Sequence, residues 1–352
     1  MRIRRGITLL EVMFSMGVIA IGLLGVIAIL PLALHQVGRG RVLDNATRVG
    51  QNAATEFRVR YMGAPANWRV ARTVAASRRS VAVSLDLRIN QGYCIDPLFV
   101  STQFDTNGAT FDARLFPYFT RPAANSNAPR MNRISLAASS VTGMMQWAGA
   151  ERVFVLQDEL VFDIPEEKDA PPIQNFGKSG ANRMYNGSTS WLATLSPNLD
   201  VTNQIHDAYV LSIVVFDNRD MTMPMDADTE RLISVDWLTS TPQPFSGLGG
   251  GDLILDSASL DDLIGIQSGK WIMLMGNTPT NVKPMPQFRW YRVVATDSEP
   301  VANATATRFR LNATVQGPDW DTRMATEAVF MPGVVAVYDR SIRLETSSLW
   351  TN

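Results

Sequence analysis

The sequence is poor in cysteine, histidine and lysine, and these shortages exclude several kinds of site. Cys94 is the single cysteine, so one chain forms neither an internal disulfide nor a cysteine-ligated metal site; we expect a small buried hydrophobe there. The two histidines, His35 and His206, lie far apart and make no His-rich metal cluster. Basic charge is carried almost entirely by arginine, because the only lysines are Lys168, Lys178, Lys270 and Lys283.

The chain also lacks an excess of either charge. Its 352 residues carry 32 Lys and Arg against 33 Asp and Glu, a net charge of -1, so no global field favours nucleic acid or anionic lipid. Hydrophobic residues make up 46% and charged residues 18%, which is typical of a folded protein, and the length suggests about two or three domains.

One long uncharged segment is present near the N-terminus. Residues 12–34 contain no charged side chain, and as a helix they would span about 34 Å, enough to cross the core of a bilayer. More arginines precede the segment than follow it, which favours a cytoplasmic N-terminus. They are Arg2, Arg4 and Arg5 before it and Arg39 and Arg41 after it.

A single carboxylate, Glu11, lies at the start of this apolar segment, where an unpaired charge is costly in lipid. A secretory signal peptide is disfavoured, because the apolar core is too long and no A-x-A-like cut site follows it. A plain transmembrane anchor fits the length but leaves Glu11 and Thr8 unexplained.

The stretch GITLLEV, residues 6–12, resembles the leader and cleavage site of type IV pilins and pseudopilins. This resemblance covers about the first 35 to 60 residues. It implies that prepilin peptidase cuts between Gly6 and Ile7, removes residues 1–6 as a leader, and methylates the new terminus at Ile7. The family usually has phenylalanine at the position of Ile7.

The same resemblance implies a structural role. We expect a minor pilin or pseudopilin, assembled with other pilin-like subunits by an inner-membrane platform into a type IV pilus or a type II secretion-type filament. Pilin-like subunits are often well under half this length, which favours a minor subunit. The chain would span the inner membrane once, with its head on the periplasmic side, before it reaches a filament or the cell surface. The alternatives are an uncleaved membrane-anchored binding protein or adhesin, and a DNA-uptake pilin.

Glu11 and Thr8 are the residues we assign to assembly. Cleavage creates a positive amine at Ile7, and Glu11 would pair with the amine of a neighbouring subunit in low-dielectric surroundings. The dipole at the helix N-terminus also favours an anion at Glu11. The competing reading is that Glu11 only caps the helix among the lipid headgroups.

Small residues interrupt the apolar segment. The glycines and the proline either let this part of the helix loosen on assembly or let it pack closely against other helices, and the sequence leaves both readings open. They are Gly17, Gly22, Gly25 and Pro31.

Beyond residue 34 the hydrophobic spacing predicts that the helix continues to about Met62. Apolar or small residues recur every three or four positions and form one helical face: Leu43, Ala46, Gly50, Ala53, Phe57 and Tyr61. We therefore expect a membrane or filament-core helix over residues 7–34 and an amphipathic half over 35–62. Gly63, Ala64 and Pro65 are expected to end the helix.

The remainder alternates with a period of two and predicts an α+β fold, with the long helix packed on an antiparallel β head. The glycine-rich stretch over residues 242–252 suggests a linker between a head, 63–245, and a second small sheet or barrel, 252–346. Strands are predicted over residues 81–89, 209–216, 270–275, 288–294, 309–316 and 334–338, a hairpin over 152–164, and a short helix over 257–264.

No catalytic motif is present, so we expect neither an enzyme nor a bound cofactor. An acidic group resembles calcium ligands only loosely and is better read as a solvated loop: Asp217, Asp220, Asp226, Asp228 and Glu230. An arginine-rich stretch, residues 58–79, is read as a solvated face, with DNA or the acidic face of a neighbouring subunit as the alternatives.

Overall fold

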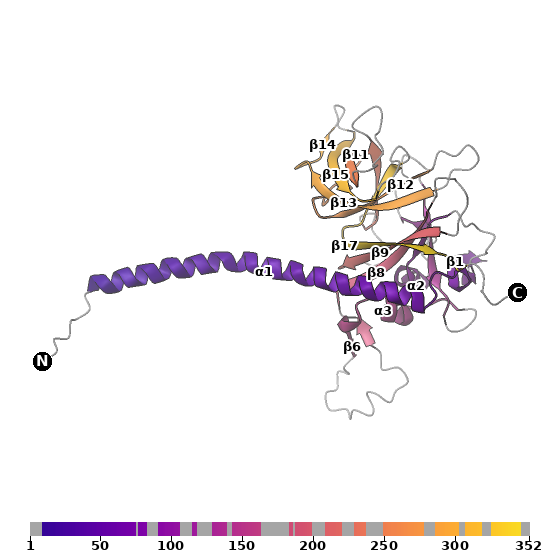
Figure 1. Cartoon of the computed structure of the whole chain (residues 1–352), viewed down its shortest axis with the longest axis horizontal. Helices are drawn as coiled ribbons and strands as arrows, with labels where there is room; N and C mark the ends of the chain where they lie inside the picture. Colours follow the sequence, from indigo (N-terminus) through magenta and orange to yellow (C-terminus); the bar gives the residue numbers. More distant parts are fainter. Residues whose placement is uncertain are drawn as a thin grey trace, which may run out of the picture. The chain divides into compact units, whose positions relative to one another are not determined.

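The computed structural model divides the chain into two compact units, Met1–Asn45 and Ala46–Asn352. It describes residues 9–74, 77–82, 91–105, 115–117, 129–138, 143–162, 183–185, 187–198, 208–219, 229–236, 249–277, 286–302, 307–318 and 325–345. The fold class is α+β, as the sequence predicts: a long N-terminal helix is followed by a region dominated by two sheets (Figure 1).

Helix α1 covers Leu9–Val59 without a break, which confirms one continuous helix through Pro31. It ends at Val59 because Tyr61, rather than Gly63, adopts the left-handed conformation, with a φ of 51°. The Met62 N–H donates to the Phe57 carbonyl (3.0 Å) and the Tyr61 N–H to the Arg58 carbonyl (3.1 Å). These two bonds form a Schellman motif, which satisfies carbonyls at the end of the helix.

The second half of α1 packs on the head through the predicted face. Ala46, Gly50, Ala53 and Phe57 are buried, as expected. Leu43 and Tyr61 are the exceptions: Leu43 is 50% exposed, and Tyr61 lies beyond the helix and is 61% exposed. Leu43 was assigned to the buried face by its spacing alone, but the buried residues of the helix begin at Ala46. The helical spacing also placed Tyr61 on the buried face, and that assignment is wrong because the left-handed turn redirects the chain.

The first sheet, here called the head sheet, has the strand order β17-β9-β8-β3-β5-β1-β2, and β4 also pairs with β5. All its pairs are antiparallel except β3 with β5. Its strands are β1 (Trp68–Val74), β2 (Ser77–Ala82), β3 (Tyr93–Ile95), β4 (Leu115–Phe116), β5 (Met131–Leu136), β8 (Thr189–Pro197), β9 (Ala208–Asp217) and β17 (Val334–Arg343).

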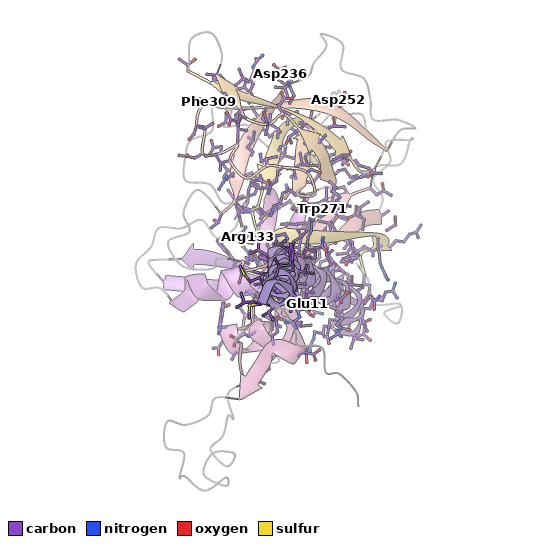
Figure 2. The ribbon with its side chains drawn as sticks, turned by 90° about the vertical axis from the view of Figure 1, so that its left-hand side faces the viewer. Glu11, Arg133, Asp236, Asp252, Trp271 and Phe309 are labelled. Carbon is purple, nitrogen blue, oxygen red and sulfur yellow. The ribbon has the colours of Figure 1, made fainter. Side chains whose placement is uncertain are left out.

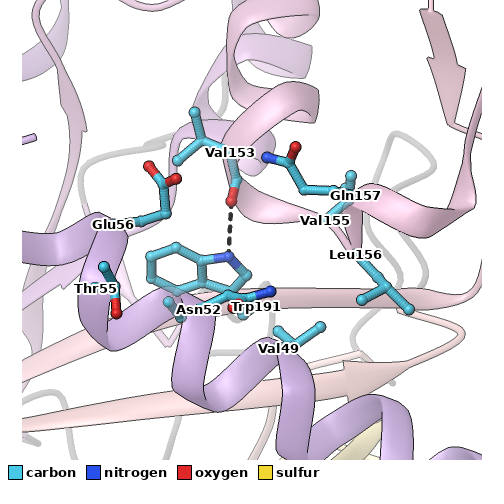
Figure 3. Close-up of a pocket in the computed structure, with 10 residues that line it drawn as sticks. Val49, Asn52, Thr55, Glu56, Val153, Val155, Leu156, Gln157 and Trp191 are labelled. Atoms are coloured by element: carbon cyan, nitrogen blue, oxygen red, sulfur yellow. Dashed lines mark hydrogen bonds between the residues drawn. The ribbon is translucent and has the colours of Figure 1, made fainter. Parts of the chain in front are cut away.

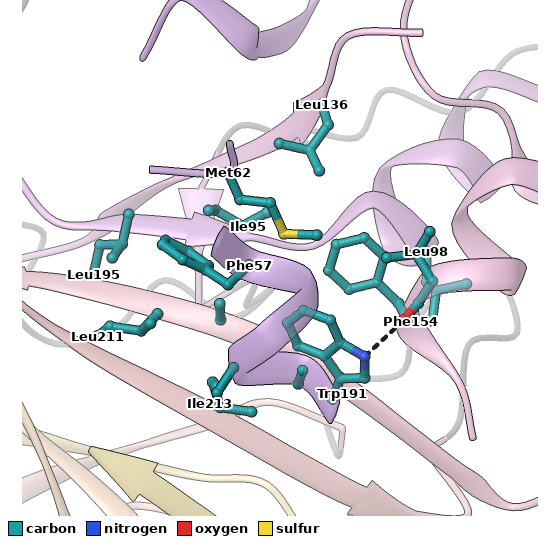
Figure 4. Close-up of a cluster of buried hydrophobic side chains, with 14 of the residues drawn as sticks. Phe57, Met62, Ile95, Leu98, Leu136, Phe154, Trp191, Leu195, Leu211 and Ile213 are labelled. Carbon is teal, nitrogen blue, oxygen red and sulfur yellow. Dashed lines mark hydrogen bonds between the residues drawn. The ribbon is translucent and has the colours of Figure 1, made fainter. Parts of the chain in front are cut away.

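Helices α1, α2 (Pro97–Asp105) and α3 (Trp147–Phe154) contribute to the core on one face of the head sheet. Phe57, Leu98 and Phe154 from the three helices join sheet residues in this core (Figure 4). The Trp191 ring stacks on Phe154, with centroids 4.4 Å apart, and its Nε1–H donates to the Val153 carbonyl at 2.9 Å. A buried tryptophan with its one donor satisfied fixes α3 on the sheet.

The second sheet closes into a six-stranded barrel in the order β11-β10-β16-β12-β13-β15, because β11 also pairs with β15. Along β15, Leu311, Ala313 and Val315 are buried and their neighbours face outward, which confirms the predicted half-buried strand. The strands are β10 (Arg231–Asp236), β11 (Gly250–Ser257), β12 (Trp271–Asn277), β13 (Pro286–Thr296), β15 (Phe309–Gln316) and β16 (Ala325–Phe330), with β14 (Val301–Ala302) beside β15.

The barrel is inserted between two neighbouring strands of the head sheet, β9 and β17. This topology differs from the division at residues 242–252. Residues 250–252 of that stretch belong to β11, which pairs with β10 and β15 of one barrel, and β17 pairs with β9 instead of joining the barrel. Glycine-rich composition suggests a break between elements, but it carries no information on how the strands on either side are paired.

The barrel packs against the head sheet through a second apolar core. Residues alternate across β3, so Tyr93 and Ile95 join the helix-side core while Cys94 joins this one. The head sheet therefore lies between the helices and the barrel. Residues of the second core include Phe116, Met131, Leu192, Val214 and Phe216 from the head, and Met273, Met275, Phe288, Trp290 and Val329 from the barrel.

Two local predictions are wrong. In the predicted hairpin over residues 152–164, the described part, 152–162, does not pair with itself: α3 continues to Phe154, η3 (Gln157–Glu159) follows, and β6 (Leu160–Phe162) pairs with β7 (Arg183–Tyr185). Residues 257–264 form the end of β11 and a turn rather than a helix, with Gly265 at a φ of 87°. A further short helix, η1 (Pro65–Asn67), precedes β1, and of the predicted strand 81–89 only residues 81–82 lie among the described residues.

Candidate functional site

The first half of α1 presents apolar side chains on every side. Leu10, Phe14, Ile21 and Leu24 are each more than 60% exposed. The most apolar 18-residue window of the helix has a mean hydropathy of 2.7 and is 0% buried. By length and composition α1 is therefore a candidate membrane span, because water is a poor solvent for such a surface.

Glu11 lies in the first turn of α1, where the helix dipole favours a negative charge. It is labelled in Figure 2. Gly6, Ile7 and Thr8, the other residues of the predicted processing and assembly site, lie outside the described residues. Their roles stay predictions.

Gly17, Gly22 and Gly25 have open space around them, since a Cβ built at each would meet no atom within 4 Å. Pro31 lies within the uninterrupted helix. No contact within the described part of the chain therefore requires glycine at these three positions. Both expectations, loosening on assembly and packing against another helix, remain predictions.

The second half of α1 borders a groove of about 370 Å³ in the head (Figure 3). Its apolar lining includes Trp191 and Val153, and its polar lining residues are Asn52, Thr55, Glu56 and Gln157. Glu56 also pairs with Arg60. Among the described lining residues Glu56 is the only acidic or basic side chain.

The acidic calcium candidates divide between two environments and the undescribed residues. Asp217 ends β9, whereas Glu230 is completely buried and accepts a hydrogen bond from Nη2 of Arg133 at 2.5 Å. The solvated-loop reading is therefore wrong for Glu230. Asp220, Asp226 and Asp228 lie outside the described residues, and the described residues contain no group of three metal ligands. Calcium binding stays a prediction.

Two further charges that the sequence did not single out join Glu230 and Arg133 in the interior. Arg219 donates to both carboxylate oxygens of Asp96, at 2.9 and 2.5 Å. Burial alone would raise the pKa of Asp96, but the guanidinium groups of Arg219 and Arg133 outweigh it and hold the pKa below its usual value. The available signal in the sequence is an arginine inside the apolar strand MNRISL.

Three aromatic residues interleave with the arginine-rich stretch in sequence. Phe57 and Trp68 are buried, whereas Tyr61 is 61% exposed. Arg69 donates to the carbonyls of Ala66 and Trp68, and Arg60 pairs with Glu56. The side chains of residues 71–82 lie outside the described part, so nucleic-acid binding there is untested.

Cys94 behaves as a small hydrophobe, as predicted. It is completely buried in the core between head sheet and barrel. Burial raises the pKa of its thiol, so the reactive thiolate is scarce.

Comparison with known proteins gives one match. Residues 1–27 match the family described as the prokaryotic N-terminal methylation motif. No curated protein and no solved structure matches the chain. The motif is the type IV pilin prepilin-type signal, so it confirms the resemblance in the leader. Together with the apolar half of α1 it fits a membrane-anchored protein. The chain therefore carries the type IV prepilin signal, and this supports a type IV pilin-like protein that prepilin peptidase processes.

Proposed function

We propose that this chain is a minor pilin or pseudopilin that is built into a type IV pilus or a type II secretion-type filament. The observation that carries the proposal is the continuity of the methylation motif with an exposed apolar helix. A pilin-like subunit leaves the membrane only if another apolar environment receives that helix, and a bundle of neighbouring helices provides one. The role is structural rather than enzymatic.

Glu11 is the residue we assign to docking. Cleavage after Gly6 gives Ile7 a charged amine, and Glu11 becomes the carboxylate in the first helical turn. An incoming subunit that aligns its amine with the Glu11 of a neighbour satisfies both charges, whereas a misaligned one leaves both in a low-dielectric bundle. The charges thus select the register, with Thr8 beside them as the motif's hydroxyl residue.

The size of the head supports a minor rather than a major subunit. The head contains three layers: helices, the eight-stranded head sheet and a closed barrel. A head of this depth would crowd a filament that carried it at every position. We place the helix across the inner membrane with the N-terminus in the cytoplasm and the head on the periplasmic side, by the arginine bias around the apolar segment.

The N-terminus of the mature protein tests the proposal. We expect protein isolated from cells to begin at Ile7 with a methylated amine, seen by mass spectrometry of the N-terminal peptide. Protein from cells without prepilin peptidase should retain residues 1–6. An intact leader in both strains would contradict the proposal and favour the uncleaved anchor or adhesin.

The abundance of the chain in filaments tests the minor role. Quantitative mass spectrometry of purified filaments should find the chain well below the principal subunit, whereas a dominant share would contradict it. Binding of the full-length protein in detergent to DNA, with steep salt dependence, would instead favour the DNA-uptake pilin.

A further inference from the structure

The barrel joins the head sheet through two crossings that lie side by side. The Asp217 N–H, at the end of β9, donates to the Gly333 carbonyl at 2.9 Å, and Phe216 pairs with Val334 at the start of β17. Within the barrel, Arg231 of the first strand pairs with Phe330 of the last. Because the two connections are adjacent, they alone would allow the barrel to rotate about the line that joins them. Other contacts must therefore fix the angle between the barrel and the head sheet.

The apolar contacts between barrel and head are poorly suited to fixing that angle. The shared core contains four methionines: Met131 from the head, Met273 and Met275 from the barrel, and Met331 at the second crossing. Methionine is unbranched and adapts to several packings, and hydrophobic contact is non-directional. This surface therefore favours contact between the two layers more than one particular arrangement of them.

Contacts between oppositely charged side chains lie at the first crossing. Asn218 adopts a left-handed φ of 52°, and the next residue, Arg219, holds Asp96 at the end of β3 with two hydrogen bonds. Glu230, which directly precedes the first barrel strand, is held by Arg133 of β5. Both ends of the segment that leaves the head and enters the barrel are thus tied to the head sheet.

The four residues Asp96, Arg133, Arg219 and Glu230, here called the ionic cluster, are isolated from water. Their side chains are at most 4% exposed. The Arg133 guanidinium lies 3.7 Å from the centroid of the Phe99 ring. Two positive and two negative charges balance, so the cluster is tolerated as a whole, but removal of one partner leaves a buried charge unpaired.

We propose that the ionic cluster is an orientation lock: it fixes the angle at which the inserted barrel sits on the head sheet. The apolar core holds the two layers together, and the cluster selects one arrangement among those that the methionines allow. A second, weaker anchor lies on β13, where Trp290 Nε1 donates to Thr194 (3.1 Å) and Arg289 to Ser196 (2.9 Å). These bonds end on neutral hydroxyls, which bind less strongly than a carboxylate.

Distances between spin labels in the full-length protein in detergent test the lock. One label replaces Val59, 68% exposed on α1, and the other replaces Val301, 64% exposed on β14. Cys94 is buried and stays unlabelled. We expect a narrow Val59–Val301 distance distribution in the parent. In Glu230→Gln that distribution should broaden or gain a second population. A reference pair within the head, Val59 and Gln157, should stay narrow.

Matched variants make the result decisive. Asp236→Asn removes an exposed barrel ion pair with Arg310, 3.3 Å long, and should leave the Val59–Val301 distribution unchanged. If Glu230→Gln does not fold, the double change Arg133→Met and Glu230→Leu removes the charges while keeping side-chain volume, and it should broaden the same distribution. An unchanged Val59–Val301 distribution in a folded variant would overturn the proposal. So would equal broadening of both label pairs, which means general loosening of the head.

Discussion

The two halves of α1 follow one helical path but expose different surfaces. The first half is apolar on all sides and its side chains stay exposed within the chain, as Leu10 and Ile21 illustrate. The second half is apolar along one face, and that face is buried against the head sheet through Ala53 and Phe57. A helix that is hydrophobic all round needs an apolar environment on all sides, whereas an amphipathic one needs a single partner surface. Folding of the chain therefore buries the apolar face of the second half, whereas the apolar surface of the first half must be covered by a membrane or by other helices.

The largest expected effect tests the first half. Glu11→Gln should leave membrane insertion and the fold of the head intact but nearly abolish incorporation into filaments, because the neighbour's amine then lacks its opposite charge. Cell fractionation and filament composition measure the two properties separately. The matched control is Glu56→Gln in the second half, where the exposed pair with Arg60 contributes little. Equal incorporation of Glu11→Gln and the parent would remove the docking role.

Phe57→Ala tests the second half and should lower the free energy of unfolding of the head by about 3–5 kcal/mol. Phe57 is 5% exposed and packs in the core between helix and sheet. Val59→Ala, at a position that is 68% exposed, should change it by less than about 0.5 kcal/mol. Chemical denaturation of the full-length protein in detergent measures both. Similar losses in the two variants would mean that this face does not anchor the helix.

Substitution of two glycines of α1, Gly50 and Gly38, repeats the comparison between buried and exposed positions of the helix with a single residue type. A Cβ at Gly50 would lie 2.3 Å from the Tyr338 ring of β17, so the added methyl group must push helix and strand apart, at about 1–3 kcal/mol. Gly38→Ala, where a Cβ meets no atom within 4 Å, should instead favour the helix by up to about 1 kcal/mol. The midpoint temperature of thermal unfolding should therefore fall for Gly50→Ala and rise for Gly38→Ala. A stabilised Gly50→Ala protein would show that the close approach is absent.

The smallest expected effect is the loss of stability of the parent protein at mildly acidic pH, and it should come from the ionic cluster. The folded-state pKa of Asp96 is held low by Arg219 and Arg133, so its contribution to stability is present above the ordinary pKa of about 3.9 and is lost as the pH falls through the folded value. The free energy of unfolding, measured from pH 7 down to pH 2, should show this loss between the ordinary pKa of Asp96 and its lower folded-state pKa. Asp96→Asn should be less stable at neutral pH and lose less on acidification. An acid dependence identical to that of the parent would contradict this assignment.

Local pattern was sufficient for the elements with strong periodicity. The continuous helix and the half-buried strand β15 follow from the spacing of their apolar residues, and the buried strand β9 follows from its nearly continuous apolar run. The processing motif is local as well, and residues 1–27 match the methylation motif.

The rest depends on contacts between residues far apart in the chain. Arg133 and Glu230 are 97 positions apart, and the residues next to each of them in sequence do not indicate that the two side chains will pair. The insertion of the barrel is not predictable from local pattern for the same reason, since β9 and β17 are neighbours in the sheet but are separated in sequence by all the strands of the barrel. The pattern over residues 152–164 is ambiguous, because short apolar runs suit a helix and a strand equally well.

The separation of β9 from β17 also bears on how the protein is made. A ribosome adds about 5–20 residues per second, so β9 is synthesised many seconds before the strand that covers its outer edge. During that interval the edge of a newly made apolar strand is open to other chains, which is a hazard for aggregation. Translation speed across the barrel-coding region, and chaperones that shield strand edges, should therefore influence the yield of this protein more than its final stability does.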